Sequence, residues 1–160
     1  MEDTMPRKQS VEERFWAKVD KAGDCWTWTA CGNADGYGRF CVNYKMEYAH
    51  RVAYSLMHGP VAEYMDIDHT CYNKSCVNPS HLRAATRKQN TENREGAQSN
   101  SKSGVRGVSW HKGSSKWVAQ VKHNGKAEHL GSFASIDAAE RVVKARRLEL
   151  FTHSDQDRVA

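Results

Sequence analysis

Residues 68–82, DHTCYNKSCVNPSHL, decide how this chain must fold. Cys71, Cys76 and His81 stand in one polar loop, and four residues separate each of them from the next. Gaps of this length let a loop fold back around one tetrahedral ion, and thiolate and imidazole groups are typical zinc ligands. The stretch therefore predicts a structural zinc site that closes the loop.

A structural zinc site needs four protein ligands, and nothing else in the loop supplies the last one. It must come from Cys25, Cys31 or Cys41. We favour Cys25, because it opens an aromatic, strand-like stretch, Cys25–Trp28, that could dock on the loop. Cys41 lies inside an expected strand, where a buried free thiol is common. A closed site has no position for water, so the zinc would not catalyse. Its role would be to hold the loop and, with it, the neighbouring His69.

Length and charge limit the remaining possibilities. A chain of 160 residues makes one ordinary domain or two very small ones. The net charge is +5, and residues 101–150 hold ten Lys or Arg against four Asp or Glu, which favours a polyanionic partner. Five cysteines, an odd number, favour metal ligation over a disulfide framework. With no apolar run of membrane-spanning length and no signal peptide, we expect an intracellular, cytoplasmic protein without a membrane partner.

The elements expected from the sequence fall on either side of a linker. Residues 1–9 are expected to be frayed, and Ser10 caps a helix that runs to Val19. The remaining elements before the linker are strands at 25–28, 39–43, 45–48, 64–69 and 81–85, and helices at 49–57 and 86–94. Residues 95–103, EGAQSNSKS, lack large side chains and predict the linker. We expect domains at 10–95 and 104–152 with a linker at 96–103.

Asp68, His69 and Asn90 form a candidate hydrolytic site. Asp68 and His69 end a predicted strand, and a bend there must re-aim one of them if both serve one site, because adjacent strand residues point to opposite faces. The helix that follows brings Asn90 back to the strand. A neutral histidine is a suitable base at pH 7, and two protein oxygens suit a magnesium ion that keeps several waters.

Residues 49–94, with Asp68-His69, Cys71, Cys76, Asn78-Pro79-Ser80-His81-Leu82 and Asn90, resemble the HNH endonucleases with a ββα-metal core, especially phage and intron-encoded homing endonucleases. The resemblance implies an α+β fold, His69 as general base, and Asp68 and Asn90 as ligands of a catalytic Mg²⁺ or Mn²⁺. It also implies structural Zn²⁺ at Cys71, Cys76, His81 and an upstream cysteine. The middle Asn of the family name has no clear counterpart, and Asn78 is expected to be structural.

The segment beyond the linker predicts a basic sheet with one packing helix. Strands are expected at 105–110, 116–123 and 126–133, with Asn124-Gly125 as a hairpin turn. Ser135 caps a helix whose packing face we place at Ala138, Val142, Ala145 and Leu148. Trp117, Ala119 and Val121 should face this helix. The outer face, which should contact double-stranded DNA, is expected to hold Arg106, His111, Lys116, Gln120, Lys122 and His129.

Residues 104–151 resemble the plant APETALA2/ethylene-response-factor DNA-binding domain, on the patterns GVRGV, KWVAQV and LGSF. Ser109, Ala127 and His129 depart from that family at base-contacting positions, so no sequence preference carries over. The whole chain therefore predicts a site-directed, metal-dependent DNA endonuclease, monomeric or homodimeric, of phage or mobile-element type, acting in a bacterial host cell if it is phage-encoded. The alternative is a non-catalytic, zinc-stabilised DNA-binding regulator, which would have no need of Asp68, His69 and Asn90 together.

Overall fold

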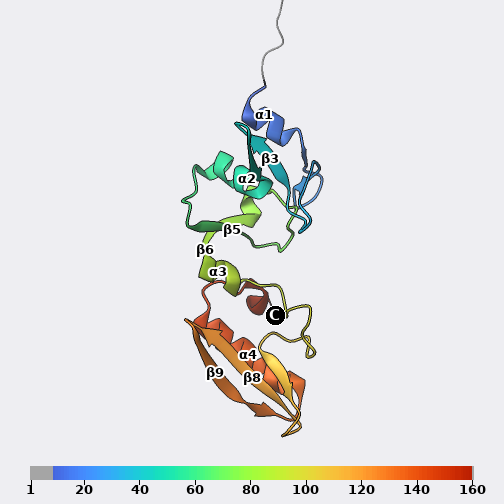
Figure 1. Cartoon of the computed structure of the whole chain (residues 1–160), viewed down its shortest axis with the longest axis vertical. Coiled ribbons are helices and arrows are strands. Elements are labelled where there is room, and N and C mark those ends of the chain that lie inside the picture. The colour runs from blue at the N-terminus through green and yellow to red at the C-terminus, as the bar shows by residue number, and fades with distance from the viewer. Residues whose placement is uncertain (1–8, 160) are drawn as a thin grey trace, which may run out of the picture. The chain divides into compact units, whose positions relative to one another are not determined.

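The chain folds into two compact units that meet in sequence between Ala85 and Thr86 (Figure 1). The computed structural model describes residues 9–159. Apart from Gln9, the frayed start expected over residues 1–9 lies outside this range. Within the described range, no helix combines the length and the apolar character needed to span a membrane.

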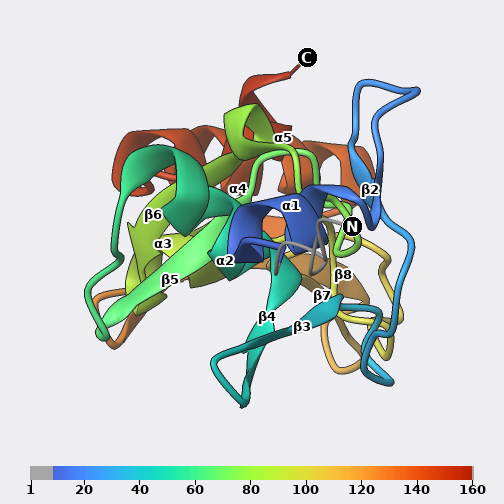
Figure 2. The ribbon, with the colours of Figure 1, turned by 90° about the horizontal axis from the view of Figure 1, so that it is seen from above.

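The first unit, residues up to Ala85, is a set of short paired strands and two helices. The helices are α1 (Val11–Trp16) and α2 (Ala49–His58), and η1 (Pro79–His81) is a single 3₁₀ turn. The strands are β1 (Val19–Asp20), β2 (Thr27–Trp28), β3 (Arg39–Val42), β4 (Lys45–Tyr48), β5 (Met65–His69) and β6 (Leu82–Thr86). They pair as β1–β2, β3–β4 and β5–β6, and Figure 2 shows β5 and β6 side by side.

An aromatic cluster forms the core of the first unit. The Phe15 ring lies 5.0 Å from Trp28 and 5.2 Å from Phe40, measured between centroids, and all three side chains are buried. Gly38 sits against this cluster, where an added Cβ would lie 2.5 Å from Trp28. Only glycine leaves room for the indole at this point, which explains why the turn before β3 ends in glycine.

The first helix is shorter than predicted. Its capping box is present, with Ser10 and Glu13 bonded to each other's backbone N–H, but α1 ends at Trp16 and not at Val19. Val19 instead pairs with Trp28 in β1–β2, and the Lys18 carbonyl accepts a hydrogen bond from the Thr29 N–H at 2.9 Å. A β-branched residue opposite an aromatic one stabilises strand pairing, and this contact overrides the local helical pattern.

The second unit, residues from Thr86, contains a three-stranded antiparallel sheet with a helix on one face (Figure 1). Its strands, in sheet order, are β7 (Val108–His111), β8 (Lys116–His123) and β9 (Lys126–Phe133). Its helices are α3 (Arg87–Glu92), α4 (Ile136–Leu150) and α5 (Asp155–Arg158). The sheet and its packing helix are therefore present as predicted, whereas α5 was not predicted.

The helix α4 packs on the sheet through a different face from the one predicted. Its buried residues are Ala139, Val143 and Arg147, which are four residues apart, whereas Leu148 is 40% exposed. The prediction was wrong because it required an apolar residue at every packing position. Arg147 is buried because its guanidinium donates to both carboxylate oxygens of Asp157, at 2.7 and 2.6 Å. This buried pair attaches α5 to α4.

Hydrogen bonds join the end of α3, and the chain that follows it, to the rest of the second unit. Arg106 donates to the Glu92 carbonyl at 2.9 Å, and the buried Glu92 carboxylate accepts from the Thr152 N–H at 3.1 Å. Within the predicted linker, the Gly96 N–H donates to Gln156 at 2.6 Å. The division between compact units thus lies upstream of residues 96–103, and α3 belongs with the sheet. The predicted domain limits of 10–95 and 104–152 stay a prediction.

Candidate functional site

Four potential metal ligands gather at one point of the first unit. The ligand atoms of Cys25, Cys71, Cys76 and His81 all lie within 4.8 Å of one another. Cys76 is fully buried, and the other three side chains are half-buried. The structure thus brings together the three ligand-type residues of the loop and the upstream cysteine that the sequence favoured.

Backbone pairing places Cys25 at this cluster. Thr27 forms an isolated antiparallel bridge with Cys76, the Val77 N–H donates to the Trp26 carbonyl at 2.8 Å, and the Trp28 N–H donates to the Ser75 carbonyl at 2.9 Å. The aromatic strand therefore docks along the second half of the loop. At the loop's ends, the Thr70 N–H donates to the His81 carbonyl at 2.9 Å, which closes it.

The distances within the cluster fit tetrahedral zinc. With Zn–S near 2.3 Å and Zn–N near 2.05 Å, sulfur and nitrogen ligands stand about 3.6 Å apart. The Sγ atoms of Cys25 and Cys76 each lie 3.6 Å from Nδ1 of His81. The other ring nitrogen of His81, Nε2, is 3.4 Å from an Asp24 carboxylate oxygen, as is usual for a metal-bound histidine. In the absence of a cation, burial raises the pKa of the Cys76 thiol to about 12.

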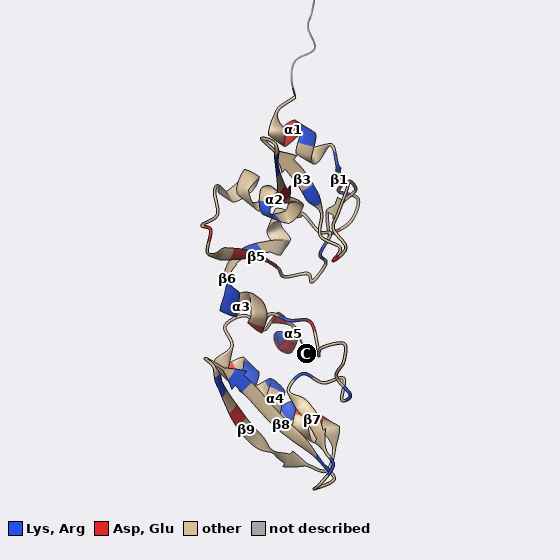
Figure 3. Ribbon diagram, viewed as in Figure 1, with Lys and Arg blue, Asp and Glu red and all other residues tan. Residues whose placement is uncertain are grey.

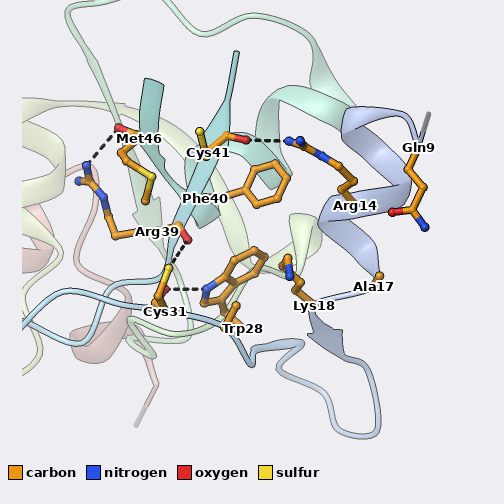
Figure 4. A pocket seen from close by; sticks show the side chains of 11 residues that line it. Gln9, Arg14, Ala17, Lys18, Trp28, Cys31, Arg39, Phe40, Cys41 and Met46 are labelled. Carbon is orange, nitrogen blue, oxygen red and sulfur yellow. Dashed lines mark hydrogen bonds between the residues drawn. The ribbon is translucent and has the colours of Figure 1, made fainter. Parts of the chain in front are cut away.

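The two remaining cysteines lie elsewhere. Cys31 and Cys41 are both exposed and line a separate cavity of about 450 Å³, together with Arg14 and Arg39 (Figure 4). Here the Arg14 guanidinium donates to the Cys41 carbonyl at 2.8 Å, and the Cys31 thiol faces the Arg39 carbonyl at 3.4 Å. Neither cysteine belongs to the Cys₃His cluster.

His69 is buried, and one of its ring nitrogens is engaged in a hydrogen bond. Nε2 lies 3.0 Å from the carbonyl oxygen of Cys76, which accepts only, so Nε2 must carry the proton and donate. In the neutral ring this leaves Nδ1 as the basic nitrogen. Burial lowers the pKa of His69, although the bond to Cys76 and the charge of Asp68 oppose that shift. The ring is therefore a neutral base of fixed tautomer at pH 7.

Asp68 takes a partner different from that of His69. Arg83 of β6 donates from Nε at 3.0 Å and from Nη2 at 2.9 Å, both to Oδ2 of Asp68. The Asp68 side chain is 6% exposed, so its charge is balanced inside the unit. Arg83 was not predicted to belong to the site. Its position on β6, the strand that pairs with β5, is the signal from which its contact with Asp68 could have been predicted.

Asn78 and Asn90 lie in different units of the chain. Asn78 is buried, donates from Nδ2 to the Asp24 carbonyl at 2.8 Å, and accepts from the Ser80 N–H at 3.1 Å, which is a structural role. Asn90 lies on α3, half-buried, in the second unit. In chain order, strand β5 is followed by the loop, then by strand β6 and then by helix α3.

The outer face of the sheet carries most of the residues predicted to contact DNA. His111 pairs with Lys116, and Gln120 pairs with His129 across the bulge at Ala119 and Gln120. These four side chains and Lys122 are exposed and alternate with the buried Ala119 and Val121. Figure 3 shows basic segments on both α4 and β9.

Arg106 lies apart from this face. It precedes β7, and its guanidinium donates to the carbonyls of Thr91 and Glu92 and covers the Phe151 ring at 5.4 Å. It therefore joins α3 to the rest of the second unit.

The first unit thus holds a buried neutral histidine of fixed tautomer, a buried carboxylate paired with an arginine, and a cluster of four potential metal ligands. Residues 47–92 match the family model described as "HNH endonuclease". The match covers α2, β5, the loop with three of the four cluster residues, β6 and α3, and leaves out Cys25. This part of the chain is therefore similar to HNH endonucleases, which supports a nuclease.

Two curated relatives come from Escherichia phage T7. "Protein 7.7" is 42% identical over 69 residues, which are 43% of this chain and 53% of the relative. "Protein 2.8" is 36% identical over 89 residues, which are 54% of this chain and 58% of the relative. The chain thus spans a little over half the length of the curated relatives it matches. No solved structure matches it significantly.

Proposed function

We propose that this protein is a metal-dependent DNA endonuclease in which His69 is the general base. The observation that carries the proposal is the bond from Nε2 of His69 to the Cys76 carbonyl at 3.0 Å. It fixes both the ring and its tautomer, so Nδ1 is prepared to take a proton from the attacking water. Positioned general bases contribute about 10²–10⁴-fold to such reactions.

Asp68 and Asn90 would hold the catalytic Mg²⁺ or Mn²⁺. A carboxylate and an amide carbonyl are hard oxygen donors, and the buried Asp68 has its charge already organised by Arg83. The ion, when bound, supplies positive charge for the phosphate oxygens as the bond to the leaving group breaks. Arg83 would orient the Asp68 carboxylate for this role.

Cys25, Cys71, Cys76 and His81 would hold a structural zinc ion. Four protein ligands leave no open position, so the ion supplies a cross-link and no chemistry. It joins the strand at Cys25–Trp28 to the loop that presents the Cys76 carbonyl to His69. A unit with so small a core gains much of its rigidity from such a cross-link.

The sheet of the second unit would bind the DNA duplex in the manner of the APETALA2-like domain predicted from the sequence. Lys116 and Lys122 would contact phosphates, Gln120 would reach a base edge, and His111 and His129 flank them on the same exposed face. The phage origin of both relatives supports action inside an infected bacterial cell. We propose that the protein acts there on DNA as a homing endonuclease.

Plasmid digestion tests the proposal. Supercoiled DNA is incubated with the purified protein with Mg²⁺, with Mn²⁺, or with a chelator of both, and nicked and linear products are separated. We expect cleavage only with the divalent ion, and none from His69→Ala. A monomer with one active site would nick one strand, whereas a symmetric dimer could cut both strands and give linear product in a single binding event. DNA binding without any cleavage under these conditions would favour the non-catalytic regulator.

A further inference from the structure

A second histidine is buried beside His69. His50 lies in the first turn of α2 and is 8% exposed. Its ring centroid is 4.8 Å from that of His69, 5.4 Å from that of Tyr37 and 5.5 Å from that of Tyr48. It therefore borders the proposed base, yet the proposed reaction assigns it nothing.

One polar atom of His50 is left without a partner. Nδ1 is buried and makes no hydrogen bond with any described residue. Leaving a buried polar atom unpaired costs stability, because the atom has lost its hydrogen bonds to water and gained none in return. A phenylalanine ring would fill the same space among Tyr37, Tyr48 and His69 without that cost. Buried polar groups that lack a hydrogen-bond partner are concentrated at functional sites, where the loss of stability is tolerated.

The location of the ring proton follows from the surroundings. Burial lowers the pKa of His50 to about 3, with His69 and Arg51 adding to the effect, so the ring is neutral at pH 7 and carries one proton. Buried N–H groups without an acceptor are rarer than buried acceptors without a donor. The proton therefore belongs on Nε2, and the buried Nδ1 keeps only its lone pair. Nε2–H is then the one donor that His50 has for a ligand.

We propose that His50 donates a hydrogen bond from Nε2 to a phosphate oxygen of the DNA strand that is cleaved. The inference rests on the proposed nuclease function, since it places the phosphate at the His69 ring. A base can act only on a water adjacent to the scissile phosphate, so a ring 4.8 Å from His69 is within reach of the same phosphate group. A neutral donor also suits this place, because a cation here would repel the imidazolium that His69 becomes.

Two substitutions at position 50 separate this role from a structural one. His50→Phe keeps a ring of similar size and removes both nitrogens. His50→Gln keeps an amide N–H close to the position of Nε2. His58, at the exposed end of the same helix, gives the matched control His58→Phe. Each full-length variant is tested for its melting temperature, its zinc content and its single-turnover rate of plasmid cleavage with Mg²⁺.

We expect His50→Phe to melt at the wild-type temperature or above, with unchanged zinc, and to cleave about 10²-fold more slowly, as when one preorganised donor is lost. His50→Gln should recover part of that rate, and His58→Phe should match the wild type. Wild-type cleavage together with a full rate for His50→Phe would overturn the inference and leave the nuclease proposal intact. A lowered melting temperature for His50→Phe would also overturn it, because the ring nitrogens would then be structural. Absence of cleavage by the wild type would overturn the proposed function itself.

Discussion

Cys76 connects the metal cluster to the proposed base, because its Sγ lies 3.6 Å from Nδ1 of His81 while its carbonyl oxygen accepts from Nε2 of His69 at 3.0 Å. The backbone N–H of Asn78 also donates to this sulfur at 3.4 Å. A displacement of the loop at Cys76 would therefore change both the ligand set and the orientation of His69.

Replacing His69 by alanine should abolish most cleavage while DNA binding is kept. The expected loss is about 10²–10⁴-fold in the single-turnover rate, because the base is removed and the phosphate contacts remain. His58→Ala, an exposed histidine of α2, is the control and should cleave normally. A near wild-type rate for His69→Ala would show that another group activates the water.

Replacing Cys76 by serine should remove zinc and lower stability, whereas Cys41→Ser should do neither. Cys41 is exposed and outside the cluster, so it is a matched control for the loss of a thiol. Zinc binding is coupled to folding in small metal-stapled domains, so the melting temperature should fall sharply when one ligand is lost. Elemental analysis should find one zinc per wild-type chain. Zinc-free wild-type protein with an unchanged melting curve would contradict the assignment.

Removing the charge of Asp157 should destabilise the second unit. Asp157→Asn leaves the buried Arg147 without its carboxylate, and breaking such a buried pair costs about 3–5 kcal/mol. The neighbouring Arg146 pairs with Glu128 at the surface, where water and salt screen the charges, so Glu128→Gln should change stability very little. Denaturant unfolding of both variants measures the difference. Equal losses would mean that α5 is not held to α4 by this pair.

Two substitutions on the outer face of the sheet should weaken DNA binding in different ways. Lys122→Ala should weaken binding to every duplex and reduce the salt slope by about one unit, because one phosphate contact is lost. Gln120→Ala should cost about 1–3 kcal/mol at a single base position and leave the salt slope unchanged. Arg141→Ala, exposed on α4, is the control. Salt-dependent titration that shows no effect of Lys122→Ala would indicate a solvated face.

Acid should destabilise the wild type more than His50→Phe. The pKa of His50 is about 3 in the folded protein, because of burial, and about 6.5 in the unfolded chain. Below pH 6.5 the unfolded state binds the proton and the folded state does not, so stability falls as the pH drops toward 3. The difference in the free energy of unfolding between the two proteins should grow by at most about 1.4 kcal/mol per pH unit over this range. Tyr37, Tyr48, His69 and Arg51 also face His50 and are present in both proteins. A constant gap from pH 7 to pH 4 would contradict the assigned pKa.

The sequence by itself determined the elements whose pattern is local. The Asn124-Gly125 turn and the alternation around Ala119 predicted the β8–β9 hairpin and its two faces, because side chains alternate along any strand. The loop with Cys71, Cys76 and His81 predicted a cluster because its short gaps limit how far those ligands can separate.

Only the tertiary structure decided which partners the remaining residues take. Cys25 joins the cluster through the bridge from Thr27 to Cys76, and Arg83 reaches Asp68 from the adjacent strand. The buried Arg147 depends on Asp157, which lies beyond the end of its helix. In each case the interaction joins residues that no periodic pattern connects. Its free energy exists only once the chain has folded. For this reason the sequence alone left three candidate cysteines for the fourth ligand, with Cys25 favoured, and did not reveal the partners of Asp68 and Arg147.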